Sequence, residues 1–190
     1  MRTLHLVRHA RSLPDPARPP ESWGLDPAGF PELLELAASA QVPSGEPTYS
    51  SPEPKALATA HVLAHPDRVG DPARAHLCEC DAVTVVEELA EHRRRPLWFD
   101  DPADFRDAVR RGFADPNVPA TPEWEPLETL RDRLVPVARR LLARHPEEDV
   151  VLVGHGTAWT LLVSELGGTA PDLDAWARLR MPVVRALTLP

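Results

Sequence analysis

Short apolar runs bounded by polar or glycine residues predict the strands of this chain. Residues 4–7 end at a polar cluster, and in residues 149–153 an aspartate is followed by four apolar residues up to the next glycine. Runs of this length are typical of strands buried on both faces of a parallel sheet, and the β-branched run 82–86 is expected to be buried in the same way. The predicted strands are residues 4–7, 48–50, 82–86, 149–153 and 183–189.

Between these runs, apolar residues recur at helical spacing, and prolines stand where a first helical turn tolerates them. Pro31 and Pro54 each open such a pattern, and Pro136 falls inside the longest one, where we expect a kink. Residues 97–125 are rich in proline, aspartate and tryptophan and predict only one short helix. The predicted helices are residues 31–37, 54–64, 104–111, 127–142 and 158–166.

Strands that alternate with helices predict an α/β fold, a three-layer α/β/α sandwich around a mostly parallel central sheet. A length of 190 residues suits one domain, and no repeat or boundary interrupts it, so residues 1–190 form a single predicted domain. Apolar residues make up 43% of the chain and charged residues 26%, which excludes a wholly disordered protein.

The net charge and the lengths of the apolar runs bear on which classes of partner the protein could bind. A formal net charge of −8 argues against nucleic acid, because proteins that bind it carry a basic balance or stripe. No run approaches the ~20 apolar residues of a membrane helix, and Arg8 and His9 interrupt the N-terminal run, so we expect neither a membrane span nor a signal peptide. Only one of the 21 basic residues, Lys55, is a lysine.

The two cysteines of the chain, Cys78 and Cys80, indicate in which cellular compartment the protein is expected and whether it is expected to bind a metal. Their spacing is poor for a disulfide framework, so a reducing cytoplasm is the expected location. With His76 they could be metal ligands, but a zinc site needs a second ligand pair at loop spacing, and none follows. The sequence therefore predicts no metal site, and a loop or strand edge here.

Two of the predicted strands are followed by a histidine. His9 stands two residues after the first apolar run, and His155 stands two residues after the run 149–153. In open α/β sheets the ligand crevice lies beyond the carboxyl ends of the strands, so neighbouring strands would bring both histidines to one crevice. Arg8 and Arg11 flank His9, which favours a site for a negatively charged group.

Five short motifs follow one another along the chain. They are Arg8-His9-Ala10-Arg11-Ser12, Leu25-Asp26-Pro27-Ala28-Gly29, Ser51-Pro52-Glu53-Pro54-Lys55-Ala56-Leu57-Ala58-Thr59-Ala60, Leu89-Ala90-Glu91 and Val153-Gly154-His155-Gly156. In order and spacing they resemble motifs of the histidine phosphatase superfamily, in its phosphoglycerate mutase-like branch. The resemblance covers residues 4 to about 166, and it implies a phosphoglycerate mutase-like fold.

The resemblance also implies roles for individual residues. His9 would be the nucleophile that forms a phosphohistidine, and Glu91 would protonate the leaving alkoxide and later take a proton from the attacking water. No metal or cofactor is implied, because cationic side chains supply the charge that phosphoryl transfer needs. The implied phosphate-binding residues are Arg8, Ser12, Lys55 and His155. A variable segment at about 92–125 would act as the substrate lid and set selectivity.

Some assignments leave alternatives open. Glu87 and Glu88 are close rivals of Glu91 for the acid role. Arg11 is a possible substrate-binding residue, and the run Arg93, Arg94 and Arg95 is either a clamp for a second anionic group or a solvated face.

Two residues depart from the family pattern. Ala10 replaces a glycine, which is tolerable if its φ stays negative. Lys55 replaces an arginine, so a point charge stands in place of a rigid two-pronged donor.

Three functions are compatible with these residues. The first is a metal-independent phosphomonoester hydrolase that acts on a small phosphorylated metabolite. The second is a phosphoglycerate mutase-type phosphotransferase, which is less expected because only 35 residues follow His155. The third is a weakly active or inactive phosphate-binding regulatory module, a hypothesis motivated by Ala10 and Lys55. The sequence identifies neither the substrate nor the oligomeric state.

Overall fold

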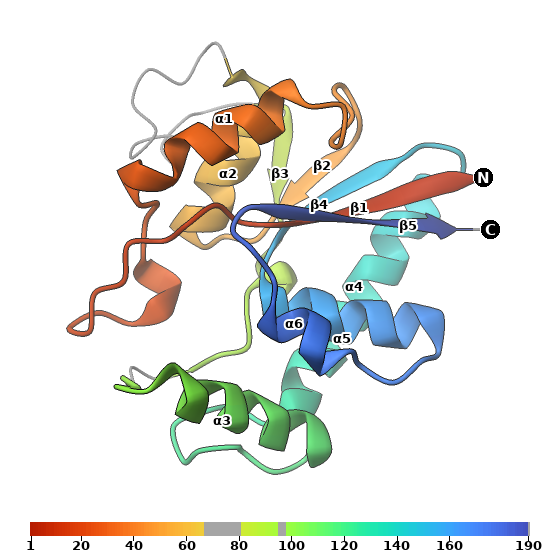
Figure 1. Cartoon of the computed structure of the whole chain (residues 1–190). Helices are drawn as coiled ribbons and strands as arrows, with labels where there is room; N and C mark the ends of the chain where they lie inside the picture. Colours follow the sequence, from red (N-terminus) through yellow and green to blue (C-terminus); the bar gives the residue numbers. More distant parts are fainter. Residues whose placement is uncertain (67–80, 95–97, 190) are drawn as a thin grey trace.

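The computed structural model describes residues 1–66, 81–94 and 98–189. Within them, five strands form one sheet that helices flank (Figure 1). The strands are β1 (Arg2–Arg8), β2 (Thr48–Ser50), β3 (Val83–Val85), β4 (Val150–Gly154) and β5 (Val183–Leu189). The helices are α1 (Phe30–Ala38), α2 (Pro54–Ala64), α3 (Pro102–Ala114), α4 (Leu127–Arg144), α5 (Gly156–Gly167) and α6 (Leu173–Ala177). Short 3-10 turns are η1 (Pro20–Ser22), η2 (Pro27–Gly29) and η5 (Glu87–Leu89).

The sheet has the strand order β3-β2-β4-β1-β5 and is parallel except for the pairing of β1 with β5. β1 and β4 are neighbours, and their register pairs Arg8 with Gly154. Parallel neighbours end at the same edge of a sheet. The residues that follow these two strands, His9 and His155, therefore meet at that edge.

The two faces of the sheet are covered by different helices. Leu4 and Leu6 of β1 lie in a core with α4 and α5, whereas Val7 packs on the opposite face with residues of α1 and α2. Figure 1 shows α1 and α2 above the sheet and α4 and α5 below it. The predicted three-layer α/β/α arrangement with a mostly parallel sheet is confirmed. A smaller cluster around Trp124 and Trp176 joins α3 and α6 below these layers.

The predicted strand at residues 82–86 forms as β3, but the prediction that it is buried is wrong. β3 is shorter and lies at the edge of the sheet, where only Val83 is buried and Val85 is 45% exposed. β-branched residues also suit an exposed edge, so composition alone did not distinguish the two positions.

The segment between η5 and α4 holds more helix than the sequence predicts. α3 begins at Pro102, because Asp101 caps it by accepting a hydrogen bond from the backbone N–H of Ala103 at 2.7 Å. Helix α6 was not predicted, although Asp172 caps it in the same way through Ala175 at 2.7 Å. Short capped helices carry too few apolar positions for periodicity to detect them.

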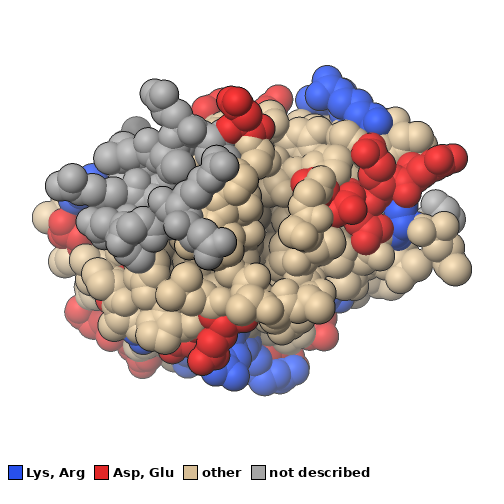
Figure 2. Space-filling model, turned by 90° about the horizontal axis from the view of Figure 1, so that it is seen from above, with Lys and Arg blue, Asp and Glu red and all other residues tan. Residues whose placement is uncertain are grey.

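Three expectations concern membranes, metals and nucleic acid. None of the helices in the described ranges is long and apolar enough to cross a membrane. The same ranges contain no group of three or more histidine, cysteine or acidic residues able to hold a metal ion; His76, Cys78 and Cys80 lie outside them. On the face shown in Figure 2, the basic side chains that are drawn form small separate groups among acidic ones.

Candidate active site

His9 and His155 lie side by side at the carboxyl ends of β1 and β4. Their ring centroids are 5.2 Å apart in an edge-to-face arrangement, and both side chains are buried. The backbone N–H of His9 donates to the carbonyl of Gly154 at 2.9 Å, which extends the strand pairing by one residue. The sheet register therefore sets the distance between the two imidazoles.

A backbone contact selects the tautomer of His9. Its Nδ1 lies 2.7 Å from the carbonyl oxygen of Ala10, which can only accept, so Nδ1 carries the hydrogen and Nε2 keeps its lone pair. Burial lowers the pKa of His9 well below its usual range, and nearby His155, Lys55 and Arg8 lower it further. At neutral pH the ring is therefore an uncharged imidazole with a free nucleophilic nitrogen.

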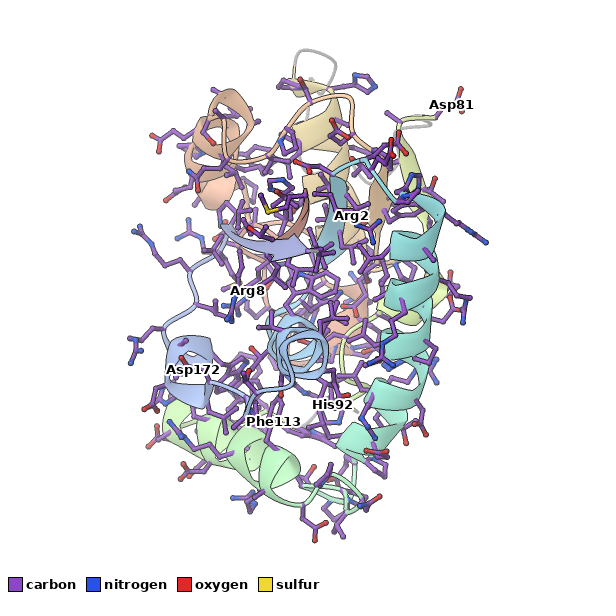
Figure 3. All side chains as sticks on the ribbon, turned by 90° about the vertical axis from the view of Figure 1, so that its right-hand side faces the viewer. Arg2, Arg8, Asp81, His92, Phe113 and Asp172 are labelled. Carbon is purple, nitrogen blue, oxygen red and sulfur yellow. The ribbon has the colours of Figure 1, made fainter. Side chains whose placement is uncertain are left out.

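Arg8 brings a guanidinium to the same edge of the sheet. Its Nη1 donates to the carbonyl of Leu179 at 2.7 Å, and its Nε is buried with no hydrogen-bond partner in the described part of the chain. Figure 3 shows Arg8 between the sheet and α6. A Cβ at Gly156 would stand 3.3 Å from Nε, so the glycine at the start of α5 leaves room for this side chain.

Ala10 fits the position where the family pattern has glycine. No residue other than glycine has a positive φ in the described ranges, so the backbone at Ala10 is unstrained. Its methyl group is buried in a small core with Leu25 and Leu33, and its N–H donates to Thr59 Oγ1 at 3.0 Å. The condition for tolerating alanine, a negative φ, is confirmed.

Lys55 lies in the first turn of α2 and is buried. Its Nζ donates to the carbonyl of Pro20 in η1 at 2.7 Å and to the carboxylate of Glu53, with which it forms an ion pair. The other carboxylate oxygen of Glu53 lies 3.3 Å from His155 Nε2. Lys55 thus lies in the same cavity as His9 and His155, with a carboxylate as its neighbour.

Glu91 lies directly against the N-terminus of α5. Its carboxylate accepts hydrogen bonds from the backbone N–H groups of His92 at 2.8 Å and of Thr157 and Ala158, both at 3.1 Å. Burial by itself raises the pKa of Glu91, but Arg94, His155 and the His92 N–H outweigh it, so the net shift is downward. Glu91 is ionised at neutral pH and must take up a proton before it can act as an acid.

Arg94 has an aromatic environment. Its guanidinium carbon lies 4.6 Å from the ring centroid of Trp124 and 5.0 Å from that of Phe105. Nη2 donates to Thr157 Oγ1 at 2.8 Å, while Nε is buried and finds no partner among the described residues. Stacking holds this cation rigidly beside Glu91.

The titratable groups described above open onto one cavity of about 830 Å³. The predicted site residues that line it are Arg8, His9, Ser12, Lys55, Glu91, Arg93, Arg94 and His155. Arg11 is not among the lining residues; its Nε pairs with Asp26 Oδ2 at 2.9 Å, which ties it to η2. Arg95 lies outside the described residues.

Comparison with known families tests the resemblance. The family model of the histidine phosphatase superfamily (branch 1) matches residues 4–186. The chain belongs to this superfamily. A search of curated protein sequences finds no match.

Several solved structures share the fold. A phosphoserine phosphatase from Entamoeba histolytica, solved as a mutant with phosphoserine, is 17% identical with a TM-score of 0.69 over 98% of this chain and 90% of that one. A mycobacterial glucosyl-3-phosphoglycerate phosphatase is 17% identical with a TM-score of 0.65 over 97% and 89%. A phosphoglycerate mutase from Bacillus anthracis is 16% identical with a TM-score of 0.68 over 97% and 86%. At these identities the likeness establishes the phosphoglycerate mutase-like fold.

Three residues of the site were missed from the sequence, and two of them, Ser51 and Glu53, lie in the quoted segment around Lys55. Ser51 Oγ is 2.8 Å from His155 Nε2, and Glu53 bridges Lys55 and His155. The sequence did offer a signal for Glu53, because an acidic residue stands two positions before Lys55, a cation expected to bind phosphate. Thr157, which contacts Arg94, carried no signal of its own.

Proposed function

We propose that the protein is a metal-independent phosphomonoester hydrolase that acts on a small phosphorylated metabolite through a phosphohistidine on His9. The observation that carries the proposal is the contact of His9 Nδ1 with the carbonyl of Ala10. It leaves an uncharged nucleophilic Nε2 beside the guanidinium of Arg8, in a cavity that a small substrate can enter. Membership of the superfamily supports the same chemistry.

The proposed reaction has two steps. His9 Nε2 attacks phosphorus, and the bond from phosphorus to the ester oxygen breaks as the nitrogen–phosphorus bond forms. Glu91, which is ionised in the free protein, takes a proton from the monoanion of the phosphomonoester as it binds and gives it to the departing alkoxide, which leaves as an alcohol. Water then attacks phosphorus and gives a proton to Glu91 as the nitrogen–phosphorus bond breaks. Inorganic phosphate is released, and the neutral imidazole of His9 is restored. Arg8, Lys55 and His155 hold the phosphoryl oxygens throughout.

Among the three arginines proposed as a clamp, Arg94 has the strongest support. It is the one that aromatic rings hold in place within the cavity, and its Nε has no partner in the described ranges. We assign it to a second anionic group of the substrate, because a guanidinium suits carboxylate and phosphate oxygens. Arg93 lines the outer part of the cavity and is exposed.

A panel of phosphomonoesters assayed for phosphate release in EDTA tests the proposal. We expect release from at least one substrate, loss of activity in His9→Ala, and an acid-labile phosphoryl group on His9 that mass spectrometry detects. Release that survives His9→Ala would refute the mechanism. Interconversion of phosphoglycerates without hydrolysis would instead favour the mutase, and trapping without turnover would favour the regulatory module.

A further inference from the structure

The cavity contains a second buried carboxylate besides Glu91. Glu53 is only 6% exposed and stands at the N-cap position of α2, directly after the segment that follows β2. A side chain at this position commonly accepts a hydrogen bond from the first turn of its own helix. The Glu53 side chain makes no such bond, and its carboxylate is directed toward the site instead.

Both oxygens of this carboxylate contact functional groups. Oε2 accepts from the Lys55 ammonium, and Oε1 accepts from the backbone N–H of Glu91 at 2.8 Å. Oε1 also lies 3.3 Å from His155 Nε2, on the side of the ring where Ser51 Oγ stands at 2.8 Å. One carboxylate thus contacts the proposed phosphate-binding lysine, the second histidine and the backbone of the proposed acid.

The number of donors on an ammonium explains why lysine suits this arrangement. Lys55 Nζ has three N–H groups, of which Glu53 and the carbonyl of Pro20 take two, and the third remains for a phosphoryl oxygen. An arginine beside Glu53 would offer its planar pair of donors to the carboxylate, because bidentate pairing is its preferred geometry. The pair of N–H groups bound to Glu53 would then point away from the substrate.

We propose that Glu53 is a positioning residue of this site, which fixes the Lys55 ammonium toward the bound phosphoryl group and holds the His155 ring in place. Lys55 and Glu53 therefore work as one unit, and the lysine is matched to its site. The inference rests on the proposed phosphatase function, but it concerns phosphate binding and can be tested without turnover.

Positioning by Glu53 and simple charge repulsion predict opposite changes in phosphate affinity when the Glu53 charge is removed. A carboxylate next to a phosphate anion should weaken its binding, so removing the charge should tighten it. If Glu53 positions the cation, Glu53→Gln weakens binding, because the ammonium and the imidazole lose their fixed acceptor. We expect the dissociation constant of inorganic phosphate, measured by calorimetry at pH 7.5, to rise at least about tenfold.

Glu87→Gln is the matched control. Glu87 lines the same cavity but is exposed and forms no ion pair in the described ranges, so its removal reports the effect of charge alone. We expect this variant to bind phosphate as well as or slightly more tightly than the wild type. Equal or tighter binding by Glu53→Gln would overturn the proposal. Should that variant not fold, Glu53→Asp, with a shorter reach, is expected to weaken binding, and unchanged affinity would overturn the proposal equally.

Lys55→Arg in two backgrounds supplies a second readout. With Glu53 present, we expect the substitution to weaken phosphate binding about tenfold or more, and to lower kcat/KM for the best substrate of the panel. With Glu53→Gln, the same substitution should strengthen both, because the guanidinium is then free to face the phosphoryl group. If Lys55→Arg changed phosphate affinity by the same factor with Glu53 and with Glu53→Gln, the proposed coupling of the two residues would be wrong. If the panel shows no hydrolysis at all, the proposed function fails while the phosphate affinities still decide the role of Glu53.

Discussion

Lowering the pH should destabilise the fold through His155 in particular. Burial, reinforced by Lys55, lowers the pKa of this side chain from 6.5 to about 3, and it is only 1% exposed. A histidine with a lowered pKa in the folded state contributes full stability above its unfolded pKa, and that stability is lost as the pH falls from 6.5 toward 3. Between pH 7.5 and pH 5 the loss from this one group is about 2 kcal/mol.

Urea denaturation in a phosphate-free buffer at pH 7.5, 6 and 5 measures this loss. His155→Gln is the reference, because glutamine cannot titrate while His9 and His92, whose pKa values are also lowered, remain in both proteins. We expect the wild type to lose about 2 kcal/mol more free energy of unfolding than the variant over this range. Parallel pH dependences in the two proteins would refute the assignment of a buried neutral imidazole at position 155.

Three further substitutions probe the surroundings of the site. Gly154→Ala places a Cβ 2.6 Å from the Trp159 ring, whose Nε1 is anchored to a backbone carbonyl, so urea denaturation should show a loss of about 1–3 kcal/mol. Glu91→Gln should lower kcat by about 10²–10⁴-fold with little change in KM for any ester that the wild type cleaves. Arg94→Met, which keeps the bulk between the rings, should raise KM about tenfold for esters with a second anionic group. It should leave KM unchanged for p-nitrophenyl phosphate, and an equal rise for both esters would contradict the assigned role.

Much of the fold could be predicted because apolar periodicity reports burial directly. The run before His9 and the run before His155 form two adjacent buried strands, and a rule about parallel sheets then brings the histidines together. Periodicity fails where a segment is half exposed or too short. β3 lies at an edge, and α6 has only five residues, so neither showed a pattern that identified its environment.

The site could be predicted only as far as its motifs extend. Arg8 ends a strand, and His9 and His155 each follow one. Arg94, by contrast, acquires its setting from Phe105 and Trp124, in a segment whose structure the sequence did not predict. The stacking of Arg94 depends on how α3, which carries Phe105, and the segment before α4, which carries Trp124, pack beside it. Local sequence does not encode such tertiary contacts, so the sequence left a solvated face open as the alternative for the arginine run.

The charges of the site show how the proposed anion binding is compatible with an acidic protein. Arg8 and Arg94 are the two cavity guanidinium groups with a buried, unpartnered Nε, and neither forms an ion pair with a described carboxylate. Glu91 lies near enough to attract both guanidinium groups without pairing directly with either, so a phosphate or carboxylate of the ligand would supply the direct partner that each lacks. Lys55 is the exception, since Glu53 already balances it. On the proposed function, Arg8 and Arg94 would pair with the ligand, whereas Lys55 already pairs with Glu53. The lysine at position 55, where the family pattern has arginine, must therefore be understood together with Glu53.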